Sequence, residues 1–468
     1  MMLWACILLP HLALDGVLRR RPTESPLVLV SGPANARTIV SANPAAREAG
    51  MRVGQKLAAA QALLAQFEAV PYDQAAVDRW HRFLAAVAYR YSAEVALFPH
   101  AVVLEVSKSM GLFGPWPRFE RLLRADLTAL GFAHRITAAP TPHAAYVLAG
   151  VGDGQAVLDD HTLRGALCHV PIQRARLPER ASDALPSMGV RTLGQLMALP
   201  RDGLRRRFGA ELLATLDRLT GDLPAGLEAY RPPDVFDLKI ELTHEVENVA
   251  SLIFPLRRVT GDLAAYLAGR DGGVQRFVLH LEHREHRVTD VVVGLLSPER
   301  DAGMLFELAR GRLDPVQLTE PVLGMRLVAR DLPAFVPGGT DLFDERPANA
   351  LPFEQLRERL RARLGDDAVY QLGSTTDPRP ERAQSPEGRT EGPDEVHPRP
   401  TWLLERPIPL RGPAPVILAG PERLETGWWD GAEVCRDYYV VRTSLGQQAW
   451  AFCPPDERNG WMIQGWFA

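Results

Sequence analysis

The first third of the chain alternates short apolar runs with longer segments of helical periodicity. Residues 4–9 form an uninterrupted apolar run, which is typical of a buried strand. Residues 27–31 and 38–41 predict two more strands around a Gly32-Pro33 turn, and residues 72–90 predict an amphipathic helix. The same patterns predict helices over residues 43–50, 55–67 and 117–130, and strands over residues 95–98, 101–106 and 135–139. This order indicates an α+β fold with a mixed sheet covered by helices.

Residues 185–200 have the pattern of a helix-hairpin-helix, two short helices joined at Gly189. A glycine at such a turn lets backbone N–H groups approach a DNA phosphate, and the following helix offers its positive N-terminus. Arg191 lies two residues beyond the glycine, and Arg205, Arg206 and Arg207 follow. The pattern fits DNA contact, and it also fits an ordinary helical hairpin that carries a solvated run of charge.

A second region of mixed pattern predicts a small sheet with two helices on one face. Its strands alternate apolar and polar residues, as half-buried strands do, and its helices have a longer period. The strands are expected over residues 237–243, 274–283, 288–296 and 322–328, and the helices over residues 249–267 and 301–312.

The last quarter of the chain divides into a polar segment and a tryptophan-rich unit. Residues 373–400 are dense in Pro, Glu, Arg, Ser and Thr and almost lack bulky apolar residues. Such a segment can bury too little apolar surface to offset the conformational entropy that it would lose on folding, so we expect it to be a disordered linker. Residues 401–468 have strand-like runs at 438–443 and 448–453 and form a separate small domain.

Composition limits the class of protein without naming a function. The net charge of −4 over 468 residues gives no overall nucleic-acid signal, so any basic surface must be local. Lysine occurs only at Lys56, Lys108 and Lys239, and arginine supplies the other cations. Arginine suits phosphate recognition, although genomic base composition explains its abundance equally well.

Cysteine usage and hydropathy predict a reduced cytoplasmic protein. The four cysteines form no CxxC pair and fit no zinc site, and we expect neither metal nor cofactor. The apolar start of the chain lacks a basic n-region, so it does not read as a signal peptide. No run of 18 or more apolar residues is present, and we expect no membrane partner.

In this order the parts resemble the Y-family (DinB/UmuC-like) DNA polymerases. The best local match is the family's fingers motif Tyr-x-Ala-Arg-x-x-Gly, which here runs from Pro44 through Arg47 to Gly50. The resemblance implies a palm over residues 1–172, with fingers inserted at about 30–70, and a helix-hairpin-helix thumb over 173–233. It further implies a little finger over 234–330, a clamp-motif segment and disordered linker over 331–400, and a partner-binding domain over 401–468.

The catalytic motifs of that family are degenerate in this chain. Active members open with Asp-x-Asp-x-Phe, and a later Asp-Glu pair helps to hold two Mg²⁺ ions for phosphoryl transfer. The matching positions here are Ile7, Leu9, His100 and Ala101. Glu105 falls at a later structural acid rather than at a metal ligand. The resemblance therefore implies a pseudo-polymerase that is not an enzyme.

Two groups that would hold an incoming nucleotide are also replaced. The fingers tyrosine becomes Pro44, and the lysine of a downstream family motif becomes Pro142. One alternative is an active translesion polymerase with a rearranged metal site, in which His100 would be a ligand, but one imidazole without carboxylates is a poor Mg²⁺ site. A helicase or nuclease finds no support, because no GxxxxGK[ST] loop is present.

The C-terminal domain resembles that of a catalytically inactive branch of the same family. The match lies in residues 420–431, which include Trp428 and Trp429, and in Arg436-Asp437 just beyond them. It implies an adaptor for translesion synthesis and SOS mutagenesis that connects the sliding clamp, an error-prone C-family DNA polymerase and a RecA-like partner on damaged DNA. Trp428, Trp429, Arg436 and Asp437 are the candidate partner surface, although most of the domain's tryptophans are expected in its core.

The candidate clamp-binding peptide is Asp341-Leu342-Phe343. Proteins of this branch carry Gln-Leu-x-Leu-Phe at that place, and Leu342 and Phe343 match its two apolar anchors. Gly339 stands where the glutamine would be. The alternative is a loop whose Leu and Phe fold back onto the preceding domain.

Overall fold

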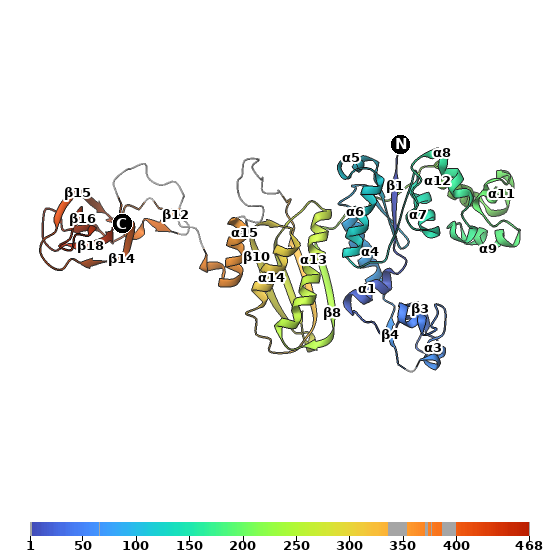
Figure 1. Cartoon of the computed structure of the whole chain (residues 1–468), viewed down its shortest axis with the longest axis horizontal. Coiled ribbons are helices and arrows are strands. Elements are labelled where there is room, and N and C mark those ends of the chain that lie inside the picture. Colours follow the sequence, from blue (N-terminus) through green and yellow to red (C-terminus); the bar gives the residue numbers. More distant parts are fainter. Residues whose placement is uncertain are drawn as a thin grey trace. The chain divides into compact units, whose positions relative to one another are not determined.

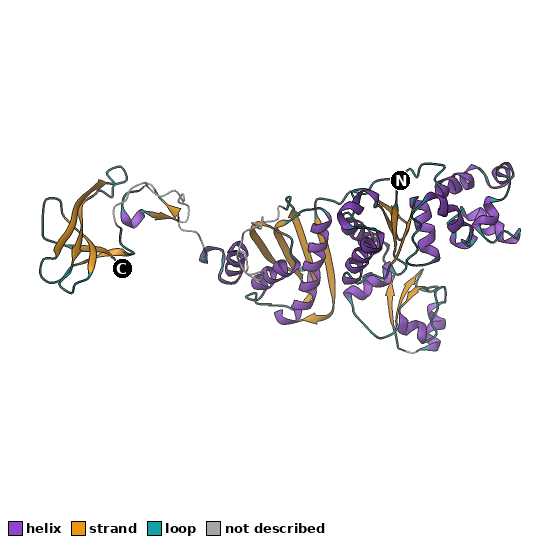
Figure 2. Cartoon of the chain, turned by 45° about the horizontal axis from the view of Figure 1, so that its top comes forward, coloured by secondary structure: helices purple, strands orange, loops and turns teal. Residues whose placement is uncertain are grey.

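The chain divides into two units in the computed structural model, Met1–Arg363 and Leu364–Ala468. The structure describes residues 2–64, 66–335, 353–369, 373–375, 377–385 and 399–467. Helices and strands alternate through the first unit, while strands dominate the second (Figure 2). The predicted α+β multidomain class is confirmed. Within the described ranges, no helix is both long and apolar enough to cross a bilayer.

The N-terminal sheet has the strand order β5-β6-β1-β7, with β1 (Trp4–Leu8) in its interior (Figure 1). Its other strands are β5 (Val95–Phe98), β6 (Ala101–Glu105) and β7 (Arg135–Ala139). All three pairings are antiparallel, so this sheet is not the mixed one that we expected. Every residue of β1 is buried, which explains why the strand reads as an unbroken apolar run.

Helices cover both faces of this sheet. Ala5 and Ile7 join the core formed with α4 (Gln74–Ala88) and α6 (Trp116–Ala129). Trp4, Cys6 and Leu8 face the other way, into the core formed with α7 (Pro142–Val151). Side chains of a strand alternate between faces, so both faces of β1 had to be apolar.

A smaller sheet with the order β3-β2-β4 is inserted after α1 (Leu12–Arg20). It consists of β2 (Leu27–Ser31), β3 (Thr38–Ala42) and β4 (Glu68–Pro71), and β4 runs parallel to β2. Two short helices, α2 (Pro44–Glu48) and α3 (Leu57–Leu63), accompany it. The helix predicted over residues 55–67 is therefore shorter, and β4 was missed because its four residues carry no clear alternation.

Residues 160–220 are helical and follow the N-terminal sheet. The helices are α8 (Asp160–Cys168), α9 (Glu179–Ser187), α10 (Leu193–Met197), α11 (Arg201–Phe208) and α12 (Ala210–Thr220). Leu185, Leu193, Leu196 and Leu212 are fully buried in a core shared with α7.

The second sheet of this unit has the order β10-β9-β11-β8 (Figure 1). Its strands are β8 (Phe236–Val246), β9 (Val274–Glu282), β10 (Val288–Glu299) and β11 (Val322–Asp331). Two helices, α13 (Ile253–Gly269) and α14 (Ala302–Leu313), lie against one face, as predicted. A further helix, α15 (Phe353–Leu364), was not expected.

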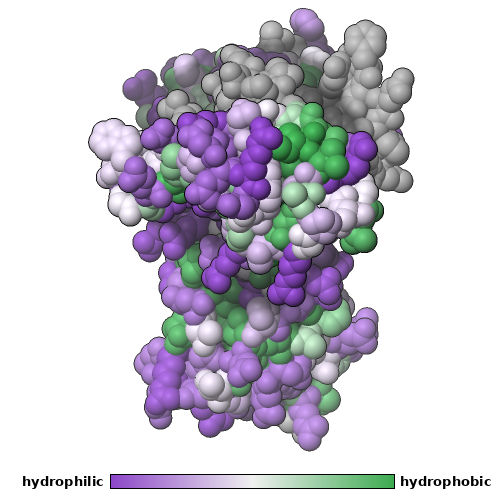
Figure 3. Space-filling model, turned by 90° about the vertical axis from the view of Figure 1, so that its left-hand side faces the viewer, coloured by the Kyte–Doolittle hydropathy of each residue, from purple (hydrophilic) through white to green (hydrophobic). Residues whose placement is uncertain are grey.

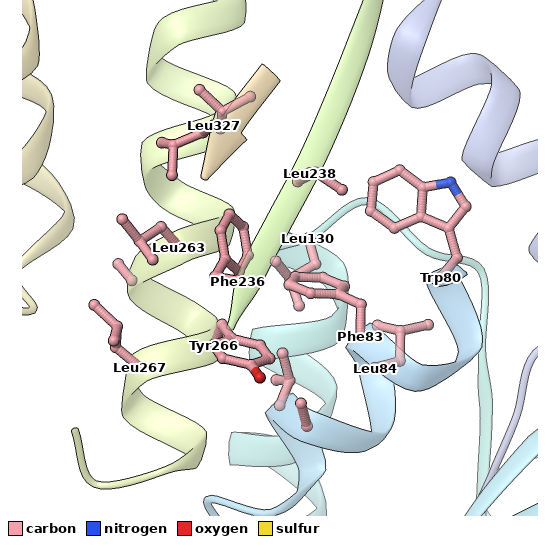
Figure 4. Close-up of a cluster of buried hydrophobic side chains, with 14 of the residues drawn as sticks. Trp80, Phe83, Leu84, Leu130, Phe236, Leu238, Leu263, Tyr266, Leu267 and Leu327 are labelled. Carbon is pink, nitrogen blue, oxygen red and sulfur yellow. The ribbon is translucent and has the colours of Figure 1, made fainter. Parts of the chain in front are cut away.

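The two sheets of the first unit share one hydrophobic core. Trp80, Phe83 and Leu84 of α4 lie close to Phe236 of β8 and to the side chains of α13, including Tyr266 (Figure 4). A Cβ on Gly269 would come within 2.0 Å of the Ala86 carbonyl oxygen, so only glycine permits this approach of α13 to α4. The sheets are therefore held by tight packing as well as by the connecting chain.

The second unit contains an antiparallel sheet with the order β14-β18-β17-β16-β15. Its strands are β14 (Trp402–Pro409), β15 (Val416–Thr426), β16 (Val434–Arg442), β17 (Gln448–Cys453) and β18 (Met462–Trp466). Tyr439, Trp461 and Ile463 belong to its core, and Tyr438 stacks on Trp450 with ring centroids 4.2 Å apart. Trp450 and Trp461 are therefore buried as expected, whereas Trp402, Trp428 and Trp429 are exposed.

On the face seen in Figure 3, hydrophilic residues cover most of the described surface, and hydrophobic ones form scattered patches.

Several short elements complete the described part of the chain. The short elements are η1 (Ser107–Ser109), α5 (Met110–Phe113), η2 (Ile172–Arg174), η3 (Val249–Leu252), η4 (Arg284–His286), η5 (Asp366–Ala368), β12 (Gly373–Ser374), η6 (Pro380–Arg382) and β13 (Gln384–Ser385).

Candidate functional site

Three of the four positions predicted to replace metal-binding carboxylates are enclosed in the core of the N-terminal sheet. Ile7 is 1% exposed, and Leu9 and Ala101 are 0% exposed. Ile7 lies opposite Val102 of β6 on one side and Ile136 of β7 on the other. These three side chains pack in apolar surroundings and are closed to solvent.

The fourth position, His100, lies in the tight turn between β5 and β6. Its backbone has φ +54°, in the left-handed region that few side chains adopt, and its side chain is exposed. Its carbonyl oxygen accepts a hydrogen bond from the Leu9 N–H at 2.8 Å, and the Tyr146 hydroxyl donates to the Pro99 carbonyl at 2.9 Å. The turn is therefore fixed against the end of β1.

The nearby acids have structural partners. Glu105 is buried at the far end of β6, opposite Trp4, and accepts a hydrogen bond from the Ser107 N–H at 3.0 Å. Asp15 accepts one from the Ala133 N–H at 2.8 Å. Burial raises the pKa of Asp15 to about 6, against the lowering effects of that hydrogen bond and of Arg19.

The residues at these positions do not fit a magnesium site. Mg²⁺ requires oxygen ligands in near-octahedral geometry, and Ile7, Leu9 and Ala101 supply none from their side chains. Over the described ranges, His, Cys, Asp and Glu side chains nowhere gather in threes that could hold a metal ion.

An open cavity of about 660 Å³ lies beside the degenerate positions. Its wall includes the end of β1, the start of α1, parts of strands β2 and β3, and η2 with Arg176 just after it. Its charged lining consists of Arg135, Arg174 and Arg176, and the imidazoles of His11 and His100 lie beside them. The pKa of His11 is lowered, chiefly by burial and further by Arg47 and Arg135. The cavity is thus electropositive.

The predicted helix-hairpin-helix is present as α9, a turn at Gly189, and α10. Gly189 has φ +85° and open space where a Cβ would be, so its backbone conformation is what favours glycine there. The N–H groups around the start of α10 are already used, because Thr192 and Gln195 form a capping box and Gln195 also accepts from the Arg191 N–H at 2.7 Å. The expected free helix N-terminus is therefore absent from this five-residue helix, and the Arg191 side chain is what remains exposed.

The arginine run lies in the last turn of α11. Arg205, Arg206 and Arg207 are exposed, and in the described part of the chain none of them pairs with a carboxylate. Arg201 of the same helix differs, since it forms an ion pair with Asp217 at 2.7 Å. The three arginines therefore keep their full charge for an anionic partner. No contact within the described residues joins them to Arg191.

The structure separates the candidate partner residues of the C-terminal domain. Trp428 and Trp429 are 77% and 58% exposed and form a T-shaped pair with centroids 5.7 Å apart. Asp437 is buried and binds Arg423 through two hydrogen bonds of 2.7 and 2.8 Å. Arg436 lies over the Phe452 ring and donates to the Tyr438 hydroxyl at 2.9 Å. Of the four candidate partner residues, only Trp428 and Trp429 are largely exposed to solvent.

One buried arginine of this unit was missed in the sequence. Arg379, in the expected linker, is 3% exposed in its side chain and pairs with Asp377 and Asp430, each at 2.6 Å. These pairs lower the pKa of Asp430 well below its usual value. Asp430, directly after Trp428-Trp429, could have suggested an ion pair, but the sequence does not show that its partner is Arg379.

The candidate clamp peptide, Asp341, Leu342 and Phe343, lies outside the described residues.

Comparisons with known proteins place these features in context. Residues 14–150 match the family model described as the impB/mucB/samB family. Protein ImuB from Caulobacter vibrioides strain NA1000 / CB15N is 27% identical over 463 residues, which cover 89% of this chain and 100% of that protein. ImuB from the strain ATCC 19089 / CIP 103742 / CB 15 matches equally.

Two solved structures are among the matches to this chain. A Dbh ternary complex has a TM-score of 0.42 and 12% identity, covering 71% of this chain and 100% of that chain. DinB from Sulfolobus solfataricus has a TM-score of 0.39 and 13% identity, covering 72% and 100%. By sequence, the chain is thus similar to ImuB over 89% of its length, and its residues 14–150 are similar to the impB/mucB/samB family.

Proposed function

We propose that this chain is a non-catalytic, DNA-binding adaptor of bacterial translesion synthesis. The observation that carries the proposal is the burial of Ile7, Leu9 and Ala101 at the positions where a polymerase of this kind needs carboxylates. The homology to ImuB supports a role in DNA damage tolerance in general. The domains of the polymerase fold would then serve to bind DNA and partner proteins and not to catalyse synthesis.

The loss of catalysis follows from the chemistry of phosphoryl transfer. Metal ions on carboxylates bring the attacking and leaving oxygens together and neutralise their charge. The acids closest in sequence are committed elsewhere: Glu105 to Ser107 and Asp15 to Ala133. Restoring a metal site would therefore require more than one substitution.

DNA binding is supported by the region that we propose as the thumb, residues 173–233. Arg191, Arg205, Arg206 and Arg207 are exposed there. Phosphate contacts from such side chains supply sequence-independent affinity that falls with salt. We propose residues 1–172 as the palm with inserted fingers and residues 234–330 as the little finger, which would hold primed or damaged DNA.

The adaptor role rests on two partner surfaces. Leu342 and Phe343, with Asp341, would bind the β sliding clamp. Trp428 and Trp429 would contact an error-prone C-family DNA polymerase or a RecA-like, ImuA-type protein, since exposed tryptophans are frequent hot spots of interfaces. The complex would act on the nucleoid, in the cytoplasm, as part of the SOS response.

A reconstituted extension reaction tests the adaptor role. The C-family polymerase is given a clamp-loaded, primed and damaged template, with and without this chain. We expect the chain to raise extension past the lesion, and L342A/F343A to abolish that gain while DNA binding is retained. As a control, Leu445→Ala removes an exposed leucine of the C-terminal domain and leaves the gain unchanged. The absence of any gain with the unmodified chain would refute the adaptor role.

A further inference from the structure

The loop between β15 and β16 carries Trp428 and Trp429 and has few restraints of its own. Both rings lie mostly in solvent, so packing in a core does not fix them. Inside the loop, the Asp430 N–H donates to the Gly427 carbonyl oxygen at 3.4 Å, and the Ala432 N–H donates to Asp430 Oδ1 at 3.1 Å. A loop with so few internal contacts opens easily unless another segment holds it.

Arg379 supplies that restraint from fifty-one residues upstream of Asp430. Its Nη1 donates to Asp430 Oδ1 at 3.1 Å and to the Ala432 carbonyl oxygen at 3.2 Å, and its Nη2 donates to Asp430 Oδ2 at 2.6 Å. Gly427 has φ +84°, and a Cβ there would come within 2.9 Å of Arg379 Nη1. The guanidinium therefore fills a space that the loop leaves open only because residue 427 is glycine.

The guanidinium is itself fixed by Asp377. Its Nε donates to Asp377 Oδ1 at 2.9 Å and its Nη2 to Asp377 Oδ2 at 2.6 Å, while the Arg379 backbone N–H donates to the same carboxylate at 3.0 Å. The five N–H groups of the guanidinium thus all find acceptors on Asp377, Asp430 and Ala432. The planar fork of arginine allows this arrangement, and the single ammonium of a lysine does not.

The segment around Arg379 is joined to the C-terminal sheet at two places. Arg382 donates to Asp430 Oδ2 at 2.6 Å, next to Arg379. Glu381 forms an ion pair with Arg436 of β16 at 3.1 Å. Residues 377–385 therefore pack as a part of the C-terminal unit and restrain the loop that follows β15.

We propose that Arg379 is a positioning residue for partner binding, which holds the loop so that Trp428 and Trp429 meet a protein partner in one prepared conformation. The inference rests on the proposed function, in which these two tryptophans contact a partner, and it adds the residue that positions them. A loop that is fixed before binding loses less conformational entropy when the partner docks. Arg379 acts through the loop, because its own side chain is only 3% exposed.

Hydrogen exchange of the full chain tests the positioning without any partner. In R379Q we expect the amides of Asp430 and Ala432 to exchange roughly 10-fold faster, because the loop loses its main restraint. Amides of β16 and β17 should keep their rates, which shows that the sheet still folds. Arg399→Gln breaks an exposed ion pair with Glu422 in the same unit and should leave the loop unchanged. Equal loop exchange in R379Q and the unmodified chain would overturn the inference.

Binding of the purified C-family polymerase and RecA-like protein then connects the loop to a partner. W428A/W429A should weaken binding roughly 30-fold or more, as truncated tryptophan hot spots do. R379Q should weaken it roughly 10-fold, and R379K, which keeps the charge without the fork, should recover only part of that loss. In a chain that already carries W428A/W429A, R379Q should cause no further loss, because Arg379 acts through the two rings.

The proposed function and the positioning role fail in different ways. If W428A/W429A leaves the affinity for both proteins unchanged, the proposed partner surface is wrong, and this role of Arg379 falls with it. If W428A/W429A weakens binding and R379Q does not, the partner surface stands and the positioning role is overturned. Should R379Q unfold the unit, R379K carries the test, and unchanged loop exchange and affinity in R379K would overturn the inference.

Discussion

Arg19 of α1 and Asp262 of α13 form an ion pair with Nη2 and Oδ1 2.5 Å apart, and their side chains are only 4% and 3% exposed. Arg19 also lies over the rings of Trp80 and Phe132, at 5.0 and 4.7 Å. Among the residues that the structure describes, Asp262 Oδ2 has no hydrogen-bond partner, and burial raises the pKa of Asp262 despite the arginine. The pair therefore joins the two sheets of the first unit at a cost in desolvation.

Removing one partner of this pair should be strongly destabilising. We expect D262A to lower the free energy of unfolding by about 3 kcal/mol or more, because it leaves the guanidinium buried and unpaired. Urea denaturation measures this. D222A breaks the exposed pair of Arg164 and Asp222, and should cost less than about 1 kcal/mol. Equal losses of unfolding free energy in D262A and D222A would contradict a stabilising role of the buried ion pair.

Asp15 predicts a pH dependence of stability. Its pKa is raised to about 6 in the fold from 3.8, so the folded state binds more protons between these values. Its contribution to stability is present below pH 3.8 and is lost as pH rises through about 6. Asp15→Asn should therefore raise the melting temperature at pH 7 relative to the unmodified protein, with the difference shrinking toward pH 4. A variant less stable than the unmodified protein at pH 7 would show that the ionised carboxylate is favoured.

Ile7→Asp tests whether the first catalytic position can accept a carboxylate again. We expect a loss of about 3 kcal/mol or more in the free energy of unfolding, because the charge would be buried between Val102 and Ile136. Ile7→Val is the matched control and should cost about 0.5–1.5 kcal/mol. Denaturation midpoints compare the two. A well-folded I7D that binds Mn²⁺ would mean that the site is only one residue from function.

The arginine run of α11 should set the salt dependence of DNA binding. For R205Q/R206Q/R207Q, the slope of log affinity against log salt should decrease by about 0.9 for each phosphate contact removed. Fluorescence anisotropy on primed DNA gives that slope. Arg201→Gln in the same helix should have little effect, because Arg201 is already paired with Asp217. An unchanged slope in the triple variant would exclude these side chains as phosphate contacts.

The sequence predicted best the elements whose burial is complete. Strand β1 is apolar because helices cover both of its faces, so no alternation is needed to recognise it. The β5–β6 hairpin was predicted from its Pro99-His100 turn, and the second sheet from its alternation. In the elements that were missed, the apolar pattern does not follow burial. In α15, for example, the apolar residues Phe353 and Leu364 are largely exposed.

The candidate sites were less accessible to sequence reading. The loss of carboxylates is a prediction that needs only single positions, such as Ile7. The cavity could not, since Arg135, Arg174 and Arg176 gain meaning only when the fold gathers them around His11. The burial of Arg379 likewise depends on Asp430, fifty-one residues away. Composition alone placed that arginine in a linker.

Primer extension by the purified protein tests the central claim most directly. A primed template is incubated with the four nucleotides and Mg²⁺ or Mn²⁺, and a gel shift is run on the same DNA. We predict a shifted band without any extension, since the chain would bind DNA but hold no catalytic metal. Extension that persists through stringent purification would contradict the account, and would mean that an acid such as Asp15 or Glu105 serves as a metal ligand.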